Sequence, residues 1–154
     1  MENVNRSLFN VPQSLYLVSV YSACAMILFF LFMKLIGLVT IVEFRFVNFV
    51  ILFFGVRTML LRLRKANNGK LEYLSGMLAG LMTAFFTCIF FTAFICIYLF
   101  IDSGFMNYLK ISQPFGSYLT PFSVGLVIFI EGIASGIIID FALMHLLNMD
   151  ENQG

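Results

Sequence analysis

Three charged side chains lie far inside long apolar runs of the sequence, and they are the residues best placed to do chemistry. Arg57 follows the apolar run 46–56, and Glu131 and Asp140 interrupt the apolar run 121–147. An ionisable group in the hydrocarbon region of a membrane is costly, so it typically forms an ion pair, binds a ligand or relays protons or ions. These residue types in this setting therefore indicate ion pairing or ion relay.

The two acidic residues do not form a catalytic pair on one helix. A helix turns by about 100° per residue, so the spacing between Glu131 and Asp140 places them on opposite faces, about 180° apart. Paired-carboxylate acid–base catalysis and a two-carboxylate metal site both need the two groups together. The two acids are therefore expected to meet different surroundings.

Arg57 and Asp140 have matching depths and are the predicted ion pair. At a helical rise of about 1.5 Å per residue, Arg57 lies about 9 Å before residue 63 and Asp140 about 10 Å before residue 147, and these two expected helix ends face the same side. A structural ion pair, an ion or proton pathway, and separate snorkelling to the interface all remain open. For Glu131 the alternatives are a hydrogen bond inside the bundle, contact with a partner subunit or ligand, and proton or ion translocation.

The remaining reactive residues favour structural roles. Cys24, Cys88 and Cys96 all fall in apolar runs, where cysteine packs as a small hydrophobic residue. His145 stands alone near the end of an apolar run, a position more typical of an interfacial side chain than of a haem ligand. The sequence contains no Walker, GxSxG, HExxH or dinucleotide-binding motif. We therefore predict no catalytic residue, no cofactor and no metal site.

The composition indicates which environment these residues occupy. The chain has 154 residues, of which 61% are hydrophobic and 11% are charged, and its net charge is +1. Soluble domains are typically about 45–50% apolar and about 25% charged. The chain therefore belongs in a lipid bilayer, and its small net charge argues against a nucleic-acid partner.

Four apolar segments are long enough to cross a bilayer as helices, which takes about 20 residues. The predicted helices cover residues 15–36, 41–63, 71–101 and 121–147. The predicted fold is an all-α, integral membrane bundle of four transmembrane helices, with residues 1–154 forming a single domain. Residues 1–14 are expected to form a loop that leads into the first helix, with Pro12 near its start. Residues 105–111 are expected to form a short interfacial helix.

Small residues recur at helical spacing on the last two long segments. Gly76 and Gly80 lie four residues apart on one segment, and Gly132 and Gly136 lie four residues apart on the other. Such spacing allows the backbones of two membrane helices to approach closely. These glycines are the predicted packing seams, either inside the bundle or between chains.

Basic residues predict the orientation in the membrane. Arg62, Arg64, Lys65 and Lys70 surround a polar turn, whereas Lys110 is the one basic residue between 102 and 120. Short loops rich in Lys and Arg stay in the cytoplasm. Four helices then place both termini in the cytoplasm. A further group, Lys34, Glu43 and Arg45, is expected to form a partly paired charge cluster at the opposite interface.

The order of elements resembles that of small four-helix membrane proteins of Bacteroidota gathered under domains of unknown function. The resemblance is carried by FGVRTMLLRLRKANNGKLEYLSGMLAG at 54–80 and FIEGIASGIIIDFAL at 129–143. It covers most of the chain after residue 44 and implies a bacterial inner-membrane protein with both termini cytoplasmic. It implies no catalytic activity.

These observations favour a non-enzymatic membrane protein that works as a subunit or accessory protein of a larger membrane complex. Its expected partners are the lipid bilayer and other membrane subunits or further copies of itself. The alternative is a small oligomeric channel or transporter that uses Arg57, Glu131 and Asp140. A membrane enzyme acting on a lipid or quinone would need polar groups at one interface, where Lys34, Glu43 and Arg45 are the candidates.

Overall fold

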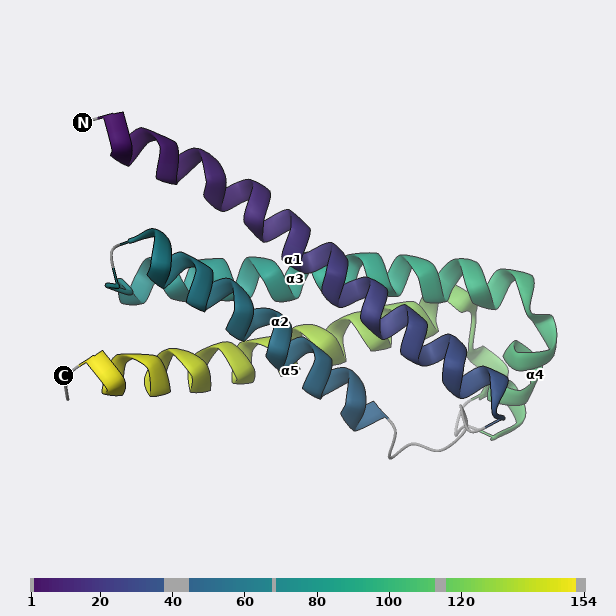
Figure 1. Ribbon diagram of the computed structural model, residues 1–154. Coiled ribbons are helices and arrows are strands. Elements are labelled where there is room, and N and C mark those ends of the chain that lie inside the picture. The colour runs from purple at the N-terminus through teal and green to yellow at the C-terminus, as the bar shows by residue number, and fades with distance from the viewer. Residues whose placement is uncertain (1, 38–44, 68, 113–115, 152–154) are drawn as a thin grey trace.

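The computed structural model describes residues 2–37, 45–67, 69–112 and 116–151, and within them the chain is all-α (Figure 1). The helices are α1 (Glu2–Leu35), α2 (Arg45–Ala66), α3 (Tyr73–Ile101), α4 (Ser103–Ser112) and α5 (Pro121–Glu151), with a 3₁₀ turn, η2 (Gly116–Tyr118). Four of them carry segments long and apolar enough to cross a membrane: Gln13–Leu35, Phe46–Ala66, Tyr73–Ile101 and Pro121–Leu147. The predicted integral membrane bundle of four helices is confirmed.

The helix ends differ from the predictions mainly at the N-terminus. The expected loop over residues 1–14 is wrong, because α1 begins at Glu2 and contains Pro12. The α1 helix continues through Pro12 although an interior proline removes one backbone hydrogen bond; the fixed φ of proline is compatible with a helix, and residues 2–11 contain no glycine and no second proline. The α5 helix also extends four residues beyond the predicted end, to Glu151. Residues 41–44, predicted as the start of the second helix, lie outside the described residues.

Local signals explain the start of the last helix. Thr120 Oγ1 accepts a hydrogen bond from the Ser123 backbone N–H at 3.1 Å, and Ser123 Oγ accepts one from the Thr120 N–H at 2.9 Å. This reciprocal pair satisfies two backbone donors that a helix start leaves open. Pro121 occupies the first helical position, where its missing N–H costs nothing.

The bundle has two distinct ends (Figure 1). The α1 N-terminus, the turn between α2 and α3, and the α5 C-terminus lie at one end, and α4 lies at the other. The core consists of two clusters along the bundle axis. One, toward the termini, includes Val56, Leu60 and Met144, and the other, toward α4, includes Phe91 and Met106.

The α3 and α5 helices share the most extensive interface in the bundle. All four predicted seam glycines lie in it. On α3, a methyl group added at Gly76 would meet Met144 Sδ at 2.6 Å, and one added at Gly80 would collide with the Asp140 carboxyl. On α5, a methyl group added at Gly132 would meet Cys88 Sγ at 2.6 Å, and one added at Gly136 would meet Ala84 Cβ at 2.5 Å. The glycine seams are therefore intramolecular.

Candidate functional site

Asp140 is a fully buried acid in the interface between α5 and α3. Its exposed fraction is 0%, and its side chain packs against Gly80, where a side chain would leave no room for it. Within the described residues, neither carboxylate oxygen has a hydrogen-bond partner. A buried polar group without a partner is costly, so Asp140 is an exception in this bundle and a candidate for function.

Arg57 does not contact Asp140, and the predicted ion pair is wrong. Arg57 is exposed on α2, and no ion pair or hydrogen bond joins these two described residues. Matching depth did place both groups within the spans, but it did not fix the direction in which each side chain points. The α2 side chains that face the core are Leu52, Val56, Met59, Leu60 and Leu63. At about 100° per residue, Arg57 projects roughly 115° away from the centre of that face.

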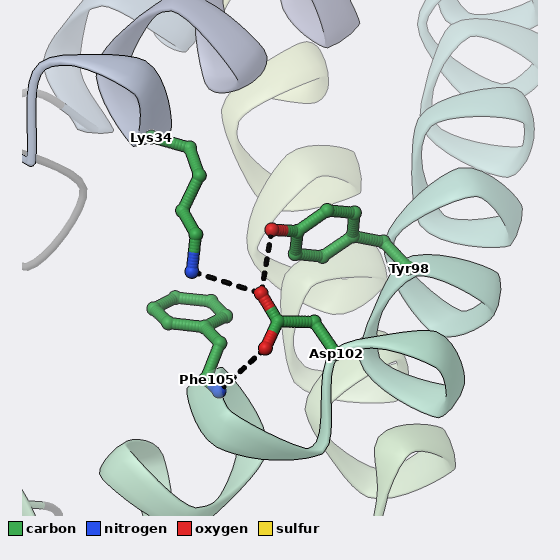
Figure 2. Close-up of polar contacts among 4 residues, drawn as sticks. All are labelled: Lys34, Tyr98, Asp102 and Phe105. Carbon is green, nitrogen blue, oxygen red and sulfur yellow. Dashed lines mark hydrogen bonds and ion pairs between the residues drawn. The ribbon is translucent and has the colours of Figure 1, made fainter.

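Lys34 and Asp102 form an ion pair at the α4 end of the bundle (Figure 2). Lys34 Nζ lies 2.9 Å from Asp102 Oδ2, and the Tyr98 hydroxyl donates a hydrogen bond to the same oxygen at 2.8 Å. The Phe105 backbone N–H donates to Asp102 Oδ1 at 2.9 Å, which makes Asp102 the N-cap of α4. Lys34 also lies 4.5 Å from the centre of the Phe105 ring. One carboxylate thus joins α1, α3 and α4.

These contacts stabilise the charged form of Asp102. The Phe105 N–H, and next the Lys34 ammonium and the Tyr98 hydroxyl, lower the pKa of Asp102 to about 2. The sequence predicts that Lys34 forms a charge cluster with Glu43 and Arg45. Glu43 lies outside the described residues, and the observed partner of Lys34 is Asp102. The missed signal is an Asp three residues before Phe105, at the spacing of an N-cap.

A cavity of about 380 Å³ lies in the half of the bundle nearer α4. Its lining is mostly aromatic and aliphatic, and it comes from the C-terminal half of α1, the N-terminal half of α2, the C-terminal half of α3, α4 and the N-terminal half of α5. The polar side chains in this lining are Asn48, Thr92, Glu131 and Ser135. Apolar walls with a few polar groups are typical of small-molecule sites, whose volumes run from about 300 to 1,000 Å³.

Two polar atoms of the cavity lining are buried without a protein partner. Asn48 Oδ1 and Thr92 Oγ1 have no hydrogen-bond partner within the described residues. Glu131 is exposed and lies in the same lining, on the opposite side of α5 from Asp140 as expected. Ser135 donates its hydroxyl to the Glu131 backbone oxygen at 2.8 Å. Glu131 therefore lies at a cavity that is not predictable from the sequence pattern, and Arg57 and Asp140 are not part of its lining.

The cysteines and His145 do not form a cluster in the described part of the chain. Cys24 is exposed, Cys88 is buried against Gly132, and Cys96 is partly buried, and all three are free cysteines. His145 is exposed on α5. The described residues contain no group of three His, Cys, Asp or Glu side chains that could hold a metal ion.

A family model described as "Protein of unknown function (DUF4199)" matches residues 18–114 of the chain. The matched region runs from within α1 through α4 and includes Asn48, Thr92, Lys34 and Asp102. Neither a curated protein nor a solved structure matches the chain.

Proposed function

Since the chain belongs to the DUF4199 family, whose function is unknown, we propose a role from the geometry of its own bundle: it is a non-enzymatic subunit or accessory protein of a larger membrane complex. The observation that supports this role is the position of Arg57. It lies eleven residues after the start of the Phe46–Ala66 span and nine before its end, and its side chain is exposed. An arginine at the centre of a membrane helix costs at least about 2.5–3.5 kcal/mol.

A partner helix would remove much of that cost. An acidic or amide side chain of the partner, placed at the same depth, would satisfy the guanidinium. The glycine seams are not available for this contact, because α3 and α5 use them within the bundle. The exposed face of α2 around Arg57 and Thr58 is therefore the proposed docking face.

The test is purification of the tagged protein in nanodiscs from its native membrane, followed by mass spectrometry of the chains that remain bound. We expect a stoichiometric membrane partner with wild-type protein and its loss with Arg57→Leu. Arg62→Leu is the matched control, because Arg62 is also exposed on α2 but lies close to the end of the span. A homogeneous protein without a partner chain would overturn the proposal, and a partner that stays bound to Arg57→Leu would overturn the docking face.

The second candidate function is a small oligomeric channel or transporter, and the burial of Asp140 favours it. A fully buried carboxyl without a hydrogen-bond partner is the kind of group that binds a proton or cation in transit. Proton and cation flux into liposomes containing the pure protein tests this role. The channel role requires flux that Asp140→Asn abolishes, with Glu131→Gln as the second variant, and the absence of flux from wild-type protein contradicts it.

We also propose a bacterial inner-membrane location with both termini in the cytoplasm. The support is that the basic turn carrying Arg64, Lys65 and Lys70 lies at the same end of the bundle as both termini (Figure 1). Short basic loops remain on the cytoplasmic side. In this orientation the Lys34–Asp102 pair faces outward.

A further inference from the structure

Four basic residues lie in and beside the turn that joins α2 to α3. They are Arg62, Arg64, Lys65 and Lys70. Arg64 is half-buried, and the other three are exposed. Among the side chains that the structure describes, no acid forms an ion pair with any of the four. The turn is therefore a concentration of positive charge that the described part of the bundle does not balance.

The backbone of the turn brings Lys70 next to the Arg64 side chain. The Gly69 N–H donates to the Arg64 backbone oxygen at 2.9 Å, and Arg64 Nε donates to the Gly69 backbone oxygen at 3.1 Å. Gly69 has a φ of +90°, which glycine adopts readily and other residues rarely. Lys70 follows directly, and its N–H donates to the Asn67 backbone oxygen at 3.1 Å. The turn thus fixes two cationic residues beside each other.

The Arg64 guanidinium keeps most of its donors free for a ligand. A guanidinium carries five N–H groups, and the bond to Gly69 uses the one on Nε. In the described structure, no acceptor bonds to either terminal nitrogen. These two nitrogens form a fork that matches two oxygens of a phosphate group. With Lys70 beside it, this fork fits a phosphate.

Glu72 is close to the turn in sequence, but it does not neutralise the basic residues. Its Oε2 accepts a hydrogen bond from the Ser75 hydroxyl at 2.7 Å, and it forms no ion pair with a described basic residue. The positive charge of the turn is therefore available to an anion from outside the described chain.

The turn lies at the depth of lipid head groups. The Phe46–Ala66 span has 21 residues, or about 31 Å of helix, which matches a hydrocarbon core of about 30 Å. Arg64 lies two residues before the end of this span, and Lys70 lies three residues before the start of the Tyr73–Ile101 span. The polar head groups form the layer directly outside the hydrocarbon core. A lipid phosphate is therefore held at this depth by the bilayer itself, whereas a free phosphate has to come from the bulk water.

We propose that the turn between α2 and α3 binds the phosphate of an anionic phospholipid. The terminal nitrogens of Arg64 bind two phosphate oxygens, Lys70 lies beside them, and the exposed Arg62 and Lys65 add positive charge around the site. This assignment goes beyond the proposed role as a complex subunit and does not depend on it, because Arg57, where the partner would dock, is not part of the site.

The experiment uses the fact that the sequence contains no tryptophan. Leu78→Trp places one tryptophan at an exposed position of α3, five residues after the start of the span. Ile97→Trp places one at an exposed position four residues before the end of the same span. Each full-length variant is placed in nanodiscs that contain brominated phosphatidylglycerol or brominated phosphatidylcholine. Bromine quenches nearby tryptophan fluorescence, so the quenching gives the ratio of the two lipid binding constants beside each tryptophan.

The turn should select the anionic lipid at its own end of the bundle. A basic residue near the membrane surface contributes about 1 kcal/mol, which is about five-fold in affinity. In Leu78→Trp protein we expect phosphatidylglycerol to bind at least about five-fold more tightly than phosphatidylcholine. In Ile97→Trp protein, which reports on the opposite leaflet, the two lipids should bind about equally.

Three further variants link the selectivity to the turn. Arg64→Gln and Lys70→Gln, each combined with Leu78→Trp, should lower the preference for phosphatidylglycerol by up to about five-fold. Lys110→Gln is the matched control, because Lys110 is exposed on α4 at the other end of the bundle. It should leave the preference unchanged. Equal tryptophan emission in lipid without bromine shows that these variants keep the same fold.

Four results would overturn the proposal. A preference near one in Leu78→Trp protein would exclude a selective lipid site, and an equal preference in Ile97→Trp protein would indicate a general attraction that is not specific to the turn. A preference that survives both Arg64→Gln and Lys70→Gln would exclude these residues as the site. Loss of the preference on addition of glycerol 3-phosphate, but not of sodium chloride at equal ionic strength, would identify a free phosphate ester as the ligand in place of a lipid.

Discussion

Asp102 and Asp140 differ in their hydrogen-bond partners and in their burial. Asp102 receives a backbone N–H, a tyrosine hydroxyl and a lysine ammonium at the α4 end. Asp140 receives no hydrogen bond from the described residues and lies completely buried between α5 and α3. We therefore expect Asp102 to stabilise the fold, and we expect Asp140 to have a role other than stabilising the fold.

The contribution of Asp102 should depend on pH. Its pKa is about 2 in the folded protein, below the value near 3.9 of an unfolded aspartate. The folded state thus favours the charged form, so the added stability is fully present above about pH 4 and disappears as the pH falls through about 2. Thermal unfolding in detergent should show a stability difference between wild type and Asp102→Asn at pH 6 that shrinks between pH 4 and pH 2.

The Lys34→Gln background provides the control for this prediction. It removes one of the contacts that lower the pKa of Asp102 but leaves the Phe105 N–H in place. The pH-dependent difference should become smaller in that background and keep its sign. A difference between wild type and Asp102→Asn that grows as the pH falls from 4 to 2 would contradict the arrangement in Figure 2.

Truncation of Asp140 should not destabilise the protein. The carboxyl has no hydrogen bond to lose, and relieving a buried unsatisfied group returns about 1–3 kcal/mol, which offsets the small void left behind. Unfolding by SDS titration should find Asp140→Ala as stable as wild type or up to about 1 kcal/mol more stable. Ile139→Ala, at a neighbouring buried position, should instead cost about 2 kcal/mol or more. Equal losses in both variants would mean that Asp140 has a stabilising partner.

At the scale of single residues, the sequence indicates which apolar run a side chain belongs to but not the direction in which it points. Arg57, Glu131 and Asp140 lie on helices that are long and apolar enough to cross a membrane. The predicted pairing of Arg57 with Asp140 was wrong, because depth leaves the rotation about each helix axis open. Asn48 and Thr92 passed unnoticed, since an amide and a hydroxyl in an apolar run gain meaning only once the cavity beside them is known.

At the scale of helices, the interface between α3 and α5 follows a regular ladder. Gly76, Gly80, Ala84 and Cys88 advance by four residues along α3, and they face Met144, Asp140, Gly136 and Gly132, which descend by four along α5. This antiparallel arrangement places a small residue at each step, so the two backbones come close together. The spacing of the glycines alone was sufficient to predict the seam. Whether the seam joined helices of one chain or of two required the structure.

Substitution within this ladder should be more damaging than substitution elsewhere. Gly136→Ala places its methyl group 2.5 Å from Ala84 Cβ, and neither backbone can move easily. We expect a loss of about 1–3 kcal/mol from overpacking, measured by SDS titration. Gly104→Ala on α4 is the matched control, because its nearest contact is 3.4 Å away, and it should stabilise α4 by up to about 1 kcal/mol. If Gly136→Ala matched this control, α3 and α5 would not be packed as closely as the ladder requires.

Helix limits were predictable where local chemistry marks them. Thr120 and Pro121 give α5 a clear start, and Asp102 separates α3 from α4. The start of α1 was missed because Pro12 resembles a helix start, whereas the helix continues through it. Pattern and turn residues thus predict a helix well when a cap is present, and less well when a proline falls inside.

At the scale of the whole molecule, the two ends of the bundle differ in what they contain. The end with both termini encloses Asp140 in a packed core, and the α4 end contains the cavity and the Lys34–Asp102 pair. The family match ends before α5, yet α5 supplies the face that covers the small-residue seam of α3. The last helix is therefore required to bury Gly80 and Ala84 and to complete the cavity wall.

The orientation of these two ends in the membrane can be measured directly. In a background where Cys24, Cys88 and Cys96 are replaced by Ala, single cysteines are introduced as Asn67→Cys and Asn107→Cys. Both positions are exposed, one beside the basic turn and the other on α4. A membrane-impermeant maleimide added to intact cells should label Asn107→Cys. It should label Asn67→Cys only after the cells are lysed, because positively charged loops stay inside.

The same experiment decides which compartment the Lys34–Asp102 pair faces. Full labelling of both variants after lysis is the control for thiol reactivity, and the background without cysteine should remain unlabelled throughout. Labelling of Asn67→Cys in intact cells, with Asn107→Cys protected, would reverse the orientation and place α4 in the cytoplasm. Replacing Arg62, Arg64, Lys65 and Lys70 with Gln should produce mixed labelling at both positions, because Lys110 would then be one of few remaining basic residues outside the spans. That result would show that the basic turn sets the orientation of the whole bundle.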